Sequence, residues 1–267
     1  EQELLLALRF YFYQYLNLRP AKSFPNVVTP VPLPEGSRLD VAVVRENTED
    51  FYMGLGGCGR GCLEQILLTK RGLYDLSGRV NLRLTKDRDM AFSLGLLTKP
   101  AVARITRKAG EMARARGENK VHVATKSNAV PHLYGFWDQA VKETAAEFDD
   151  LEFSFVNVDA LCYLLPRQPL DFGVLLCPNL FGDIVSDLMS ALAGGLGLAA
   201  SGNIGAVLSL FEPVHVSSPT IAGRGPANPF AAFMLMSILL HPLCLTYAAL
   251  SVDPAVFVFL SSPSQPS

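Results

Sequence analysis

The sequence has little charge and few of the residues that mark the common specialised protein classes. Only 18% of its 267 residues are charged, five are cysteines, and 23 basic against 25 acidic residues leave a formal net charge of −2. A chain this close to neutral has no general field to attract DNA or anionic lipid, so any anion must be bound by local arginines. The odd number of scattered cysteines, in a chain too long to need disulfide bridges, favours a reducing cytoplasm.

Zinc binding and membrane insertion are both disfavoured by what the chain lacks. Cys58 and Cys62 are four residues apart, but no second pair or nearby histidine completes a set of four zinc ligands. The apolar tail from Pro229 is interrupted at His241-Pro242 and at Asp253-Pro254 before the roughly 20 residues of a membrane span are complete. The 49% of hydrophobic residues is instead enough for a substantial core. We therefore expect a globular protein.

Helical and strand patterns alternate along the chain. The spacing of apolar residues predicts a helix over 3–16, a proline-rich connection over 20–35 and a strand over 39–45. From Pro100 to Gly117, apolar residues three and four apart with a basic end predict an amphipathic helix. The segments KVHVA and FGVLLCP are typical of strands, and HLYGFWDQAVKETAAEF is typical of a helix. This alternation, without a fixed-period repeat, predicts an α/β fold.

Two glycine-rich segments match the spacing of a dinucleotide-binding loop. They run from Gly54 to Gly59 and from Gly195 to Ala200. The first is separated from the apolar run VAVV by a mostly polar segment, and the second follows a helical pattern instead of a strand. We interpret both as turn glycines, and we regard a conventional Rossmann dehydrogenase as the weaker alternative.

Three aspartates are candidates for binding a divalent cation. Asp183 and Asp187 are four residues apart at the start of a predicted helix, so both carboxylates can face one hard cation such as Mg²⁺ or Mn²⁺. Two acids in a first helical turn can equally be explained by their interaction with the helix dipole. Asp159 is a third acid at a strand-to-helix transition, the part of an α/β sheet where ligands bind. Its presence favours the metal site.

Arginines, one lysine and one tyrosine could complete such a site. Arg9, Arg19 and Arg45 would together hold a di- or tricarboxylate, whereas separately they would form ordinary ion pairs. Lys126 follows a predicted buried strand, and a lysine near a metal and arginines can act as a base near neutrality; elsewhere it would be a solvated loop residue. Tyr52 could return a proton to carbon, or could be a core aromatic.

Six longer motifs resemble the β-decarboxylating dehydrogenases, which include isocitrate, 3-isopropylmalate, homoisocitrate and tartrate/D-malate dehydrogenases. The motifs are LRFYFYQYLNLRPAKSFP, VRENTEDFYMG, TKSNA, NLFGDIVSD, GGLGLAASGNIG and LFEPVHVSSPTIAGRGPANP. The resemblance implies a two-domain α/β fold of the isocitrate/isopropylmalate dehydrogenase type, in which one domain is built from both chain ends. Residues 1–20 and 193–267 would form a partial cofactor-side domain, and residues 21–192 the central substrate, metal and dimerisation domain.

The resemblance also implies an activity: NAD(P)-dependent, divalent-metal-dependent oxidative decarboxylation of a 2-hydroxy acid with a β-carboxylate. It places Arg9, Arg19 and Arg45 on the substrate, Tyr52 and Lys126 at the acid/base positions, and Asp159, Asp183 and Asp187 on Mg²⁺ or Mn²⁺. The lysine and the first of these aspartates would come from the neighbouring subunit of a homodimer. Cofactor-side positions fall on Asn128, Glu212, His215, Ser217, Ser218 and Asn228.

The chain departs from the family pattern in its cofactor loop and at its ends. The family usually has HGSAPDIAG in this loop, whereas this chain has HVSSPTIAG, with Val216 at a glycine position and Thr220 at the position of an acid that binds the ribose. The loop lacks the basic signature expected for binding the 2'-phosphate of NADP, so we favour NAD over NADP. We expect further chain before Glu1 and an incomplete terminal domain. The alternative function is that of a noncatalytic regulatory or structural subunit, or an inactive fragment, of the same family. We expect a cytoplasmic location, or the mitochondrial matrix if chain before Glu1 carries a transit peptide.

Overall fold

The computed structural model of the protein describes residues 2–71, 74–84, 86–215, 223–224, 228–240 and 246–261. Its helices are α1 (Gln2–Tyr11), α2 (Lys99–Ala115), α3 (Pro131–Ala145), α4 (Val158–Arg167), α5 (Asn179–Leu192), α6 (Phe230–Leu240) and α7 (Thr246–Ser261), with short 3₁₀ helices η1 (Pro169–Asp171) and η2 (Leu196–Leu198). Its strands are β1 (Leu16–Lys22), β2 (Asp40–Glu46), β3 (Asp50–Arg60), β4 (Cys62–Arg71), β5 (Tyr74–Arg83), β6 (Asp89–Leu96), β7 (Lys120–Thr125), β8 (Glu152–Asn157), β9 (Val174–Cys177), β10 (Ala200–Ile204) and β11 (Leu210–Pro213).

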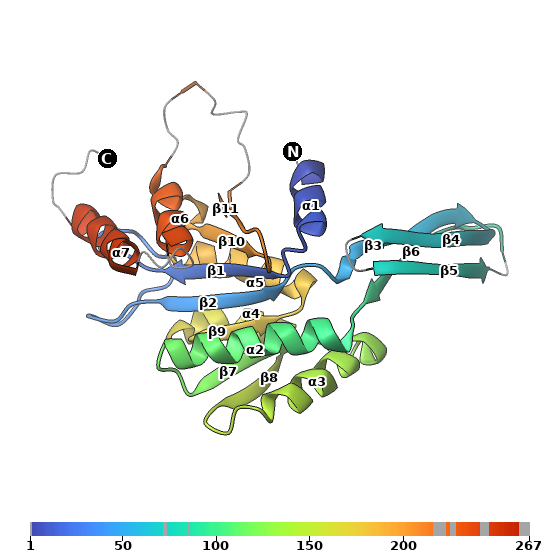
Figure 1. The fold of residues 1–267 in the computed structure, drawn as a ribbon, viewed down its shortest axis with the longest axis horizontal. Helices are drawn as coiled ribbons and strands as arrows, with labels where there is room; N and C mark the ends of the chain where they lie inside the picture. Colours follow the sequence, from blue (N-terminus) through green and yellow to red (C-terminus); the bar gives the residue numbers. More distant parts are fainter. Residues whose placement is uncertain are drawn as a thin grey trace.

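A seven-stranded sheet in the order β11-β10-β1-β2-β9-β7-β8 forms the centre of the body. Strands β2, β9, β7 and β8 are parallel to one another, whereas β1 joins β2 antiparallel and β10 and β11 continue the sheet antiparallel. All four residues of β9 are buried, as the continuous apolar run FGVLLCP predicts. Helices α2 and α3 lie on one face of the sheet and α4 and α5 on the other (Figure 1). The predicted α/β class is confirmed. Strands from both proposed domains share this sheet, and the boundary between the domains stays a prediction.

Helix α2 forms where the sequence predicts it. The hydroxyl of Thr98 accepts a hydrogen bond from the main-chain N of Ala101 at 3.4 Å, and proline occupies the first turn. Val102, Ile105 and Ala109 are fully buried on one side of the helix, at the three- and four-residue spacing that the sequence shows. The amphipathic pattern therefore determines which face of α2 packs on the sheet.

The first helix is shorter than predicted. It ends at Tyr11 instead of continuing to residue 16, and β1 then occupies Leu16–Lys22, part of which was predicted as a proline-rich connection. Long-range pairing explains the difference, because β1 pairs with β2 along its whole length. Pro20 is accommodated because β10 pairs only with Leu16–Leu18, so the missing N–H of the proline faces no partner strand.

Strands β3 to β6 form an arm that projects from the body (Figure 1). The interpretation of Gly54–Gly59 as turn glycines is wrong, since these residues lie within β3. Strands β3 and β6 form one hairpin-like pair and β4 and β5 another, and a Cβ atom on Gly59 would lie 2.9 Å from a methyl carbon of Leu63. The glycines thus allow β3 and β4 to approach closely near the end of the arm.

The turn between β2 and β3 buries three acidic residues: Glu46, Glu49 and Asp50 are each fully buried. The carboxylate of Glu49 accepts hydrogen bonds from the hydroxyl of Tyr74 on β5 at 2.7 Å and from the hydroxyl of Thr98 at 2.6 Å. It therefore ties the arm to the start of α2. These acids form the base of the arm.

The buried Glu46 should make the stability of the protein depend on pH. Burial and the nearby charge of Glu49 raise the pKa of Glu46 to about 7, against hydrogen bonds from Thr48 and Glu49 that favour the charged form. The folded pKa exceeds the unfolded value of 4.5, so between pH 4.5 and pH 7 Glu46 keeps its proton in the folded state and loses it in the unfolded state. The free energy of unfolding therefore falls as pH rises through this range.

The test compares the wild-type protein with Glu46→Gln, whose amide oxygen can still accept the hydrogen bond from the hydroxyl of Thr48. Relative to this variant, the wild-type free energy of unfolding should fall by up to about 3 kcal/mol between pH 4.5 and pH 7 and change little above it. Urea unfolding across this pH range measures the difference. Glu35→Gln, at an exposed position, is the control for loss of one charge, and parallel pH profiles for wild type and Glu46→Gln would contradict the prediction.

Helices α6 and α7 pack together beside the β10–β11 end of the sheet. Met234 on α6 and Val256 and Leu260 on α7 are buried there with Phe24 and Leu198. In the described part of the chain, none of the helices combines the length and the hydrophobicity needed to cross a bilayer.

Candidate active site

Two carboxylates extend from the middle of α5. Asp183 and Asp187 are one turn apart, and their side chains are 38% and 57% exposed. Because residues four apart share a helix face, both side chains can offer oxygens to one cation. The helical placement that the sequence predicts for these two residues is therefore present.

Arg45, near the end of β2, lies against the start of α5 and is 1% exposed. Its Nη1 donates to Oδ1 of Asp183 at 2.5 Å, and its Nε donates to the main-chain oxygen of Asn179 at 2.9 Å and to the side-chain oxygen at 3.1 Å. The hydroxyl of Tyr52 donates to Oδ2 of Asp183 at 2.8 Å. Both oxygens of Asp183 are thus engaged, one by the guanidinium and the other by the phenol.

Arg19 reaches the same helix from the neighbouring strand. It is paired opposite Val43, two residues from Arg45, so the two arginines share one face of the sheet. Its Nη1 lies 3.3 Å from Oδ1 of both Asp183 and Asp187 and donates to Oγ of Ser186 at 2.8 Å. The pairing of β1 with β2 is therefore what brings the two arginines together.

Arg9 on α1 completes a cluster of three guanidinium groups. It is 8% exposed, and its Nε has no hydrogen-bond partner among the described residues. Burial, and next to it the positive charges of Arg45 and Arg19, together lower the pKa of Arg9 to about 10. The charges of Arg45 and Arg19 therefore act on Arg9, and the three guanidinium groups form one electrostatic group. We call Arg9, Arg19 and Arg45 the arginine cluster.

The surroundings set the charge states of the acids and of the phenol. Burial opposes ionisation of Asp183, but Arg45 and Arg19 outweigh it, so the pKa of Asp183 lies below its usual value. Burial and the hydrogen bond to Asp183 raise the pKa of Tyr52, so the phenol keeps its proton at neutral pH. Burial raises the pKa of Asp187, with Arg19 acting in the opposite direction. The site therefore contains a proton donor beside an ionised carboxylate.

Lys126 and Asp159 form a separate pair. Lys126 follows β7, Asp159 lies in the first turn of α4, and Nζ contacts Oδ1 at 2.6 Å. The hydrogen bond lowers the pKa of Asp159, which is 68% exposed. Among the described residues, no group of three or more histidine, cysteine or acidic side chains could hold a metal ion. One chain therefore brings Asp183 and Asp187 together and leaves Asp159 apart from them.

Asp183 and Asp187 fit a divalent cation as part of a larger ligand set. They offer carboxylate oxygens, the donors that Mg²⁺ and Mn²⁺ prefer, from one partly exposed helix face. Two protein ligands leave positions for substrate or water oxygens and for a third carboxylate. The donor set is therefore suitable and incomplete within one chain.

The predicted cofactor-side residues are only partly described. Glu212 on β11 accepts a hydrogen bond from Nδ2 of Asn203 at 2.9 Å, and its charge acts on Arg9 and Arg19. Glu212 therefore contributes negative charge beside the arginine cluster. Asn128, His215 and Asn228 are exposed, and Val216, Ser217, Ser218 and Thr220 lie outside the described residues.

Asn179 and Ser186 contact the arginine cluster, and the sequence interpretation did not identify them. Each lies on the same side of α5 as Asp183, four residues before it and three residues after it. The helical spacing within NLFGDIVSD was the available signal. It was overlooked because asparagine and serine carry no charge that marks them as site residues.

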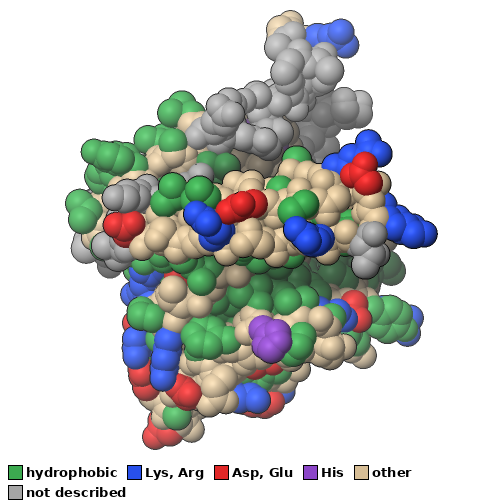
Figure 2. Space-filling model, turned by 90° about the vertical axis from the view of Figure 1, so that its right-hand side faces the viewer, with side chains coloured by type: hydrophobic (Ala, Val, Ile, Leu, Met, Phe, Trp, Pro, Cys, Tyr) green, Lys and Arg blue, Asp and Glu red, His purple; other side chains and the backbone are tan. Residues whose placement is uncertain are grey.

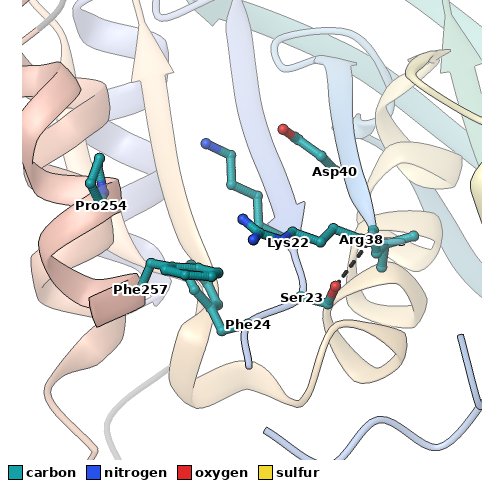
Figure 3. Close-up of a pocket in the computed structure, with 8 residues that line it drawn as sticks. Lys22, Ser23, Phe24, Arg38, Asp40, Pro254 and Phe257 are labelled. Atoms are coloured by element: carbon teal, nitrogen blue, oxygen red, sulfur yellow. Dashed lines mark hydrogen bonds between the residues drawn. The ribbon is translucent and has the colours of Figure 1, made fainter. Parts of the chain in front are cut away.

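A cavity of about 330 Å³ lies away from this site, between α7 and the ends of β1 and β2 that are remote from Arg45. Figure 3 shows Phe24 and Phe257 on one side of it, with Lys22, Arg38 and Asp40 nearby. The guanidinium carbon of Arg38 lies 4.0 Å from the centre of the Phe257 ring. This cavity shares no lining residue with the arginine cluster.

Comparisons with known proteins agree with the geometry. The family model for isocitrate/isopropylmalate dehydrogenase matches residues 1–266. The 3-isopropylmalate dehydrogenases of Beutenbergia cavernae and Thermobifida fusca are 39% and 38% identical over 259 residues, covering 96% of this chain and 67% of each relative. The crystal structure of isocitrate dehydrogenase from Methylococcus capsulatus matches with a TM-score of 0.81 and 33% identity, covering 98% of this chain and 69% of that one. The chain therefore spans about two thirds of the length of these relatives and belongs to the isocitrate/isopropylmalate dehydrogenase family.

Proposed function

We propose that this chain is the catalytic subunit of an NAD(P)- and divalent-metal-dependent dehydrogenase that oxidises and decarboxylates a 2-hydroxy acid of the 3-isopropylmalate type. The observation that carries the proposal is the convergence of the arginine cluster, the carboxylates of α5 and the phenol of Tyr52. A dicarboxylate substrate requires cations, the metal requires carboxylates, and decarboxylation requires a proton donor. The names of the Beutenbergia cavernae and Thermobifida fusca relatives, both 3-isopropylmalate dehydrogenases, support the substrate class.

The residues of the site would divide the reaction among them. When bound, the divalent cation polarises the hydroxyl and adjacent carboxylate of the substrate and stabilises the negative charge that develops as CO₂ leaves, while NAD(P)⁺ accepts the hydride. The arginine cluster holds the substrate carboxylates. Lys126 removes the proton of the hydroxyl group, and Tyr52, which stays protonated at neutral pH, gives a proton to the carbon that has lost CO₂.

A homodimer would complete the site, because Lys126 and Asp159 are apart from Asp183 in one chain. Exposed apolar side chains accompany the acids: Tyr163, four residues after Asp159 on α4, is 61% exposed, and Ile184, next to Asp183 on α5, is 51% exposed. Figure 2 shows further apolar surface in the hollow below the arm. Uncovered apolar surface of this kind supports contact with a second copy, which would supply its own lysine and aspartate.

The test of the activity follows formation of reduced nicotinamide in the presence of Mn²⁺. We expect turnover with 3-isopropylmalate, and loss of turnover when EDTA removes the metal. Isocitrate, tartrate and D-malate should be poorer substrates, and NAD and NADP are tested side by side. A chimaera that adds the remaining third of the Beutenbergia cavernae relative serves as a second preparation. If both preparations fold and neither oxidises any of these acids, the proposed function is wrong.

The position of Leu5 leads to a prediction about substrate choice. Leu5 lies one turn before Arg9 on α1 and is partly exposed, so it can contact an apolar substituent of a substrate held by the arginine cluster. Leu5→Ser should lower kcat/KM for 3-isopropylmalate roughly 10- to 100-fold and leave that for D-malate, which lacks the isopropyl group, within about threefold.

The matched control is Leu4→Ser. Leu4 is 63% exposed and lies about 100° further around the helix, so its replacement should leave both substrates unaffected. Steady-state kinetics on the two acids measure the effect. Equal losses for 3-isopropylmalate and D-malate in Leu5→Ser would show that this residue does not contact the isopropyl group.

A further inference from the structure

Ser186 lies between the two carboxylates of α5 and is 1% exposed. Its Oγ donates to the main-chain oxygen of Asp183 at 3.0 Å and accepts a hydrogen bond from Nη1 of Arg19 at 2.8 Å. Because the hydroxyl hydrogen is committed to the helix backbone, the oxygen lone pairs are directed to the guanidinium. The hydroxyl is therefore a fixed acceptor for Arg19.

The other acceptors of Arg19 are the groups that would bind the metal. Its Nη1 is 3.3 Å from Oδ1 of Asp183 and 3.3 Å from Oδ1 of Asp187, longer than its contact with Ser186. When Asp183 and Asp187 turn to a divalent cation, their charge is shared with it and the cation repels the guanidinium. Ser186 carries no charge and its backbone bond is unaffected, so it remains available to Arg19.

Arg45 has an equivalent neutral partner. Its Nε donates to both oxygens of Asn179, which is fully buried at the start of α5, while its Nη1 contacts Asp183. Arg45 thus has one acidic and one uncharged partner on α5, and Arg19 has two acidic partners and one uncharged partner on the same helix. The uncharged partners do not compete for a cation.

We infer that Ser186 is a positioning residue that holds Arg19 in its substrate-binding place once Asp183 and Asp187 have turned to the metal. The inference rests on the proposed function. Without metal, the two carboxylates hold Arg19 whether or not the serine is present. With metal, the serine becomes the remaining protein acceptor among these contacts, so its loss releases the guanidinium.

The experiment measures the Kd of 3-isopropylmalate by calorimetry, in Mn²⁺ and in EDTA. Ser186→Ala should weaken binding about tenfold in Mn²⁺ and less than about twofold in EDTA. Ser186→Thr, which keeps the hydroxyl, should restore most of the affinity in Mn²⁺. Ser190→Ala is the matched control, because Ser190 is also buried on α5 and its hydroxyl donates only to the main-chain oxygen of Ser186, at 2.8 Å.

The outcomes separate the inference from the proposed function. If wild type binds and Ser186→Ala loses affinity equally in Mn²⁺ and EDTA, or keeps full affinity in both, the positioning role is overturned and the proposed function stands. If wild type binds no 3-isopropylmalate in either condition, both are overturned. A crystal structure of the wild-type protein with Mn²⁺ alone gives an independent measurement: Arg19 should stay hydrogen-bonded to Ser186, and a guanidinium turned away from it would overturn the inference.

Discussion

Lys126→Ala should lower turnover roughly 100- to 10,000-fold, the range expected when a general base is removed. The fold should be unaffected, because Lys126 contacts an aspartate that is 68% exposed, and such pairs contribute little to stability. Lys120→Ala, which removes a lysine paired with Glu152 on the neighbouring strand, is the control for loss of a paired lysine. Steady-state kinetics and thermal unfolding measure the two effects, and turnover near the wild-type level would show that another group is the base.

Mixing two inactive variants tests whether Lys126 acts on the neighbouring subunit. In a dimer of a Lys126→Ala chain with an Asp187→Asn chain, one site would combine the intact Asp187 of the first with the intact Lys126 of the second. Random reassortment should therefore restore about a quarter of wild-type activity, since half of the dimers are mixed and each has one complete site. If the lysine acted within its own chain, every site in the mixture would remain defective and activity would not return.

The sequence predicts those parts of the fold that depend on local patterns. The apolar spacing of Val102 and Ile105 specifies the buried face of α2, and the continuous apolar run of β9 indicates a strand covered on both faces. Strand β1 was not predicted, because its conformation is fixed by pairing with β2, beyond the range of any local pattern. The arm was overlooked because its small core of Met53, Leu55 and Leu67 comes from separate strands.

The candidate site likewise has features that the local sequence pattern predicts and features that it does not. The four-residue spacing of Asp183 and Asp187 requires only that α5 be helical, so it could be predicted from the sequence. The convergence of Arg19 with Arg45 depends on the register of β1 against β2, and the family motifs, not the local pattern, indicated it. The burial of Glu46 could not be predicted, because acidic residues are almost never fully buried without specific hydrogen-bond donors.

Gly182→Ala should destabilise the protein and weaken dicarboxylate binding together. A Cβ atom at this position would lie 2.5 Å from Cγ, 2.7 Å from Cβ and 3.0 Å from Cδ of Arg45. The arginine cannot turn aside, because its own Cβ is fixed to β2 and its guanidinium is held by Asn179 and Asp183. We expect a loss of about 1–3 kcal/mol in the free energy of unfolding, typical of overpacking, and at least about tenfold weaker binding of 3-isopropylmalate.

Gly135→Ala on α3 is the matched control, because no heavy atom lies within 4 Å of the Cβ that it would add. The same change in chemistry should there stabilise the helix by up to about 1 kcal/mol and leave binding unchanged. Urea unfolding and calorimetry on both variants measure the contrast. Helix propensity alone favours alanine at both positions. Destabilisation by Gly182→Ala together with stabilisation by Gly135→Ala would therefore show that the side chain of Arg45 requires glycine at position 182. A stable Gly182→Ala protein with wild-type affinity would instead show that Arg45 can move without affecting the site.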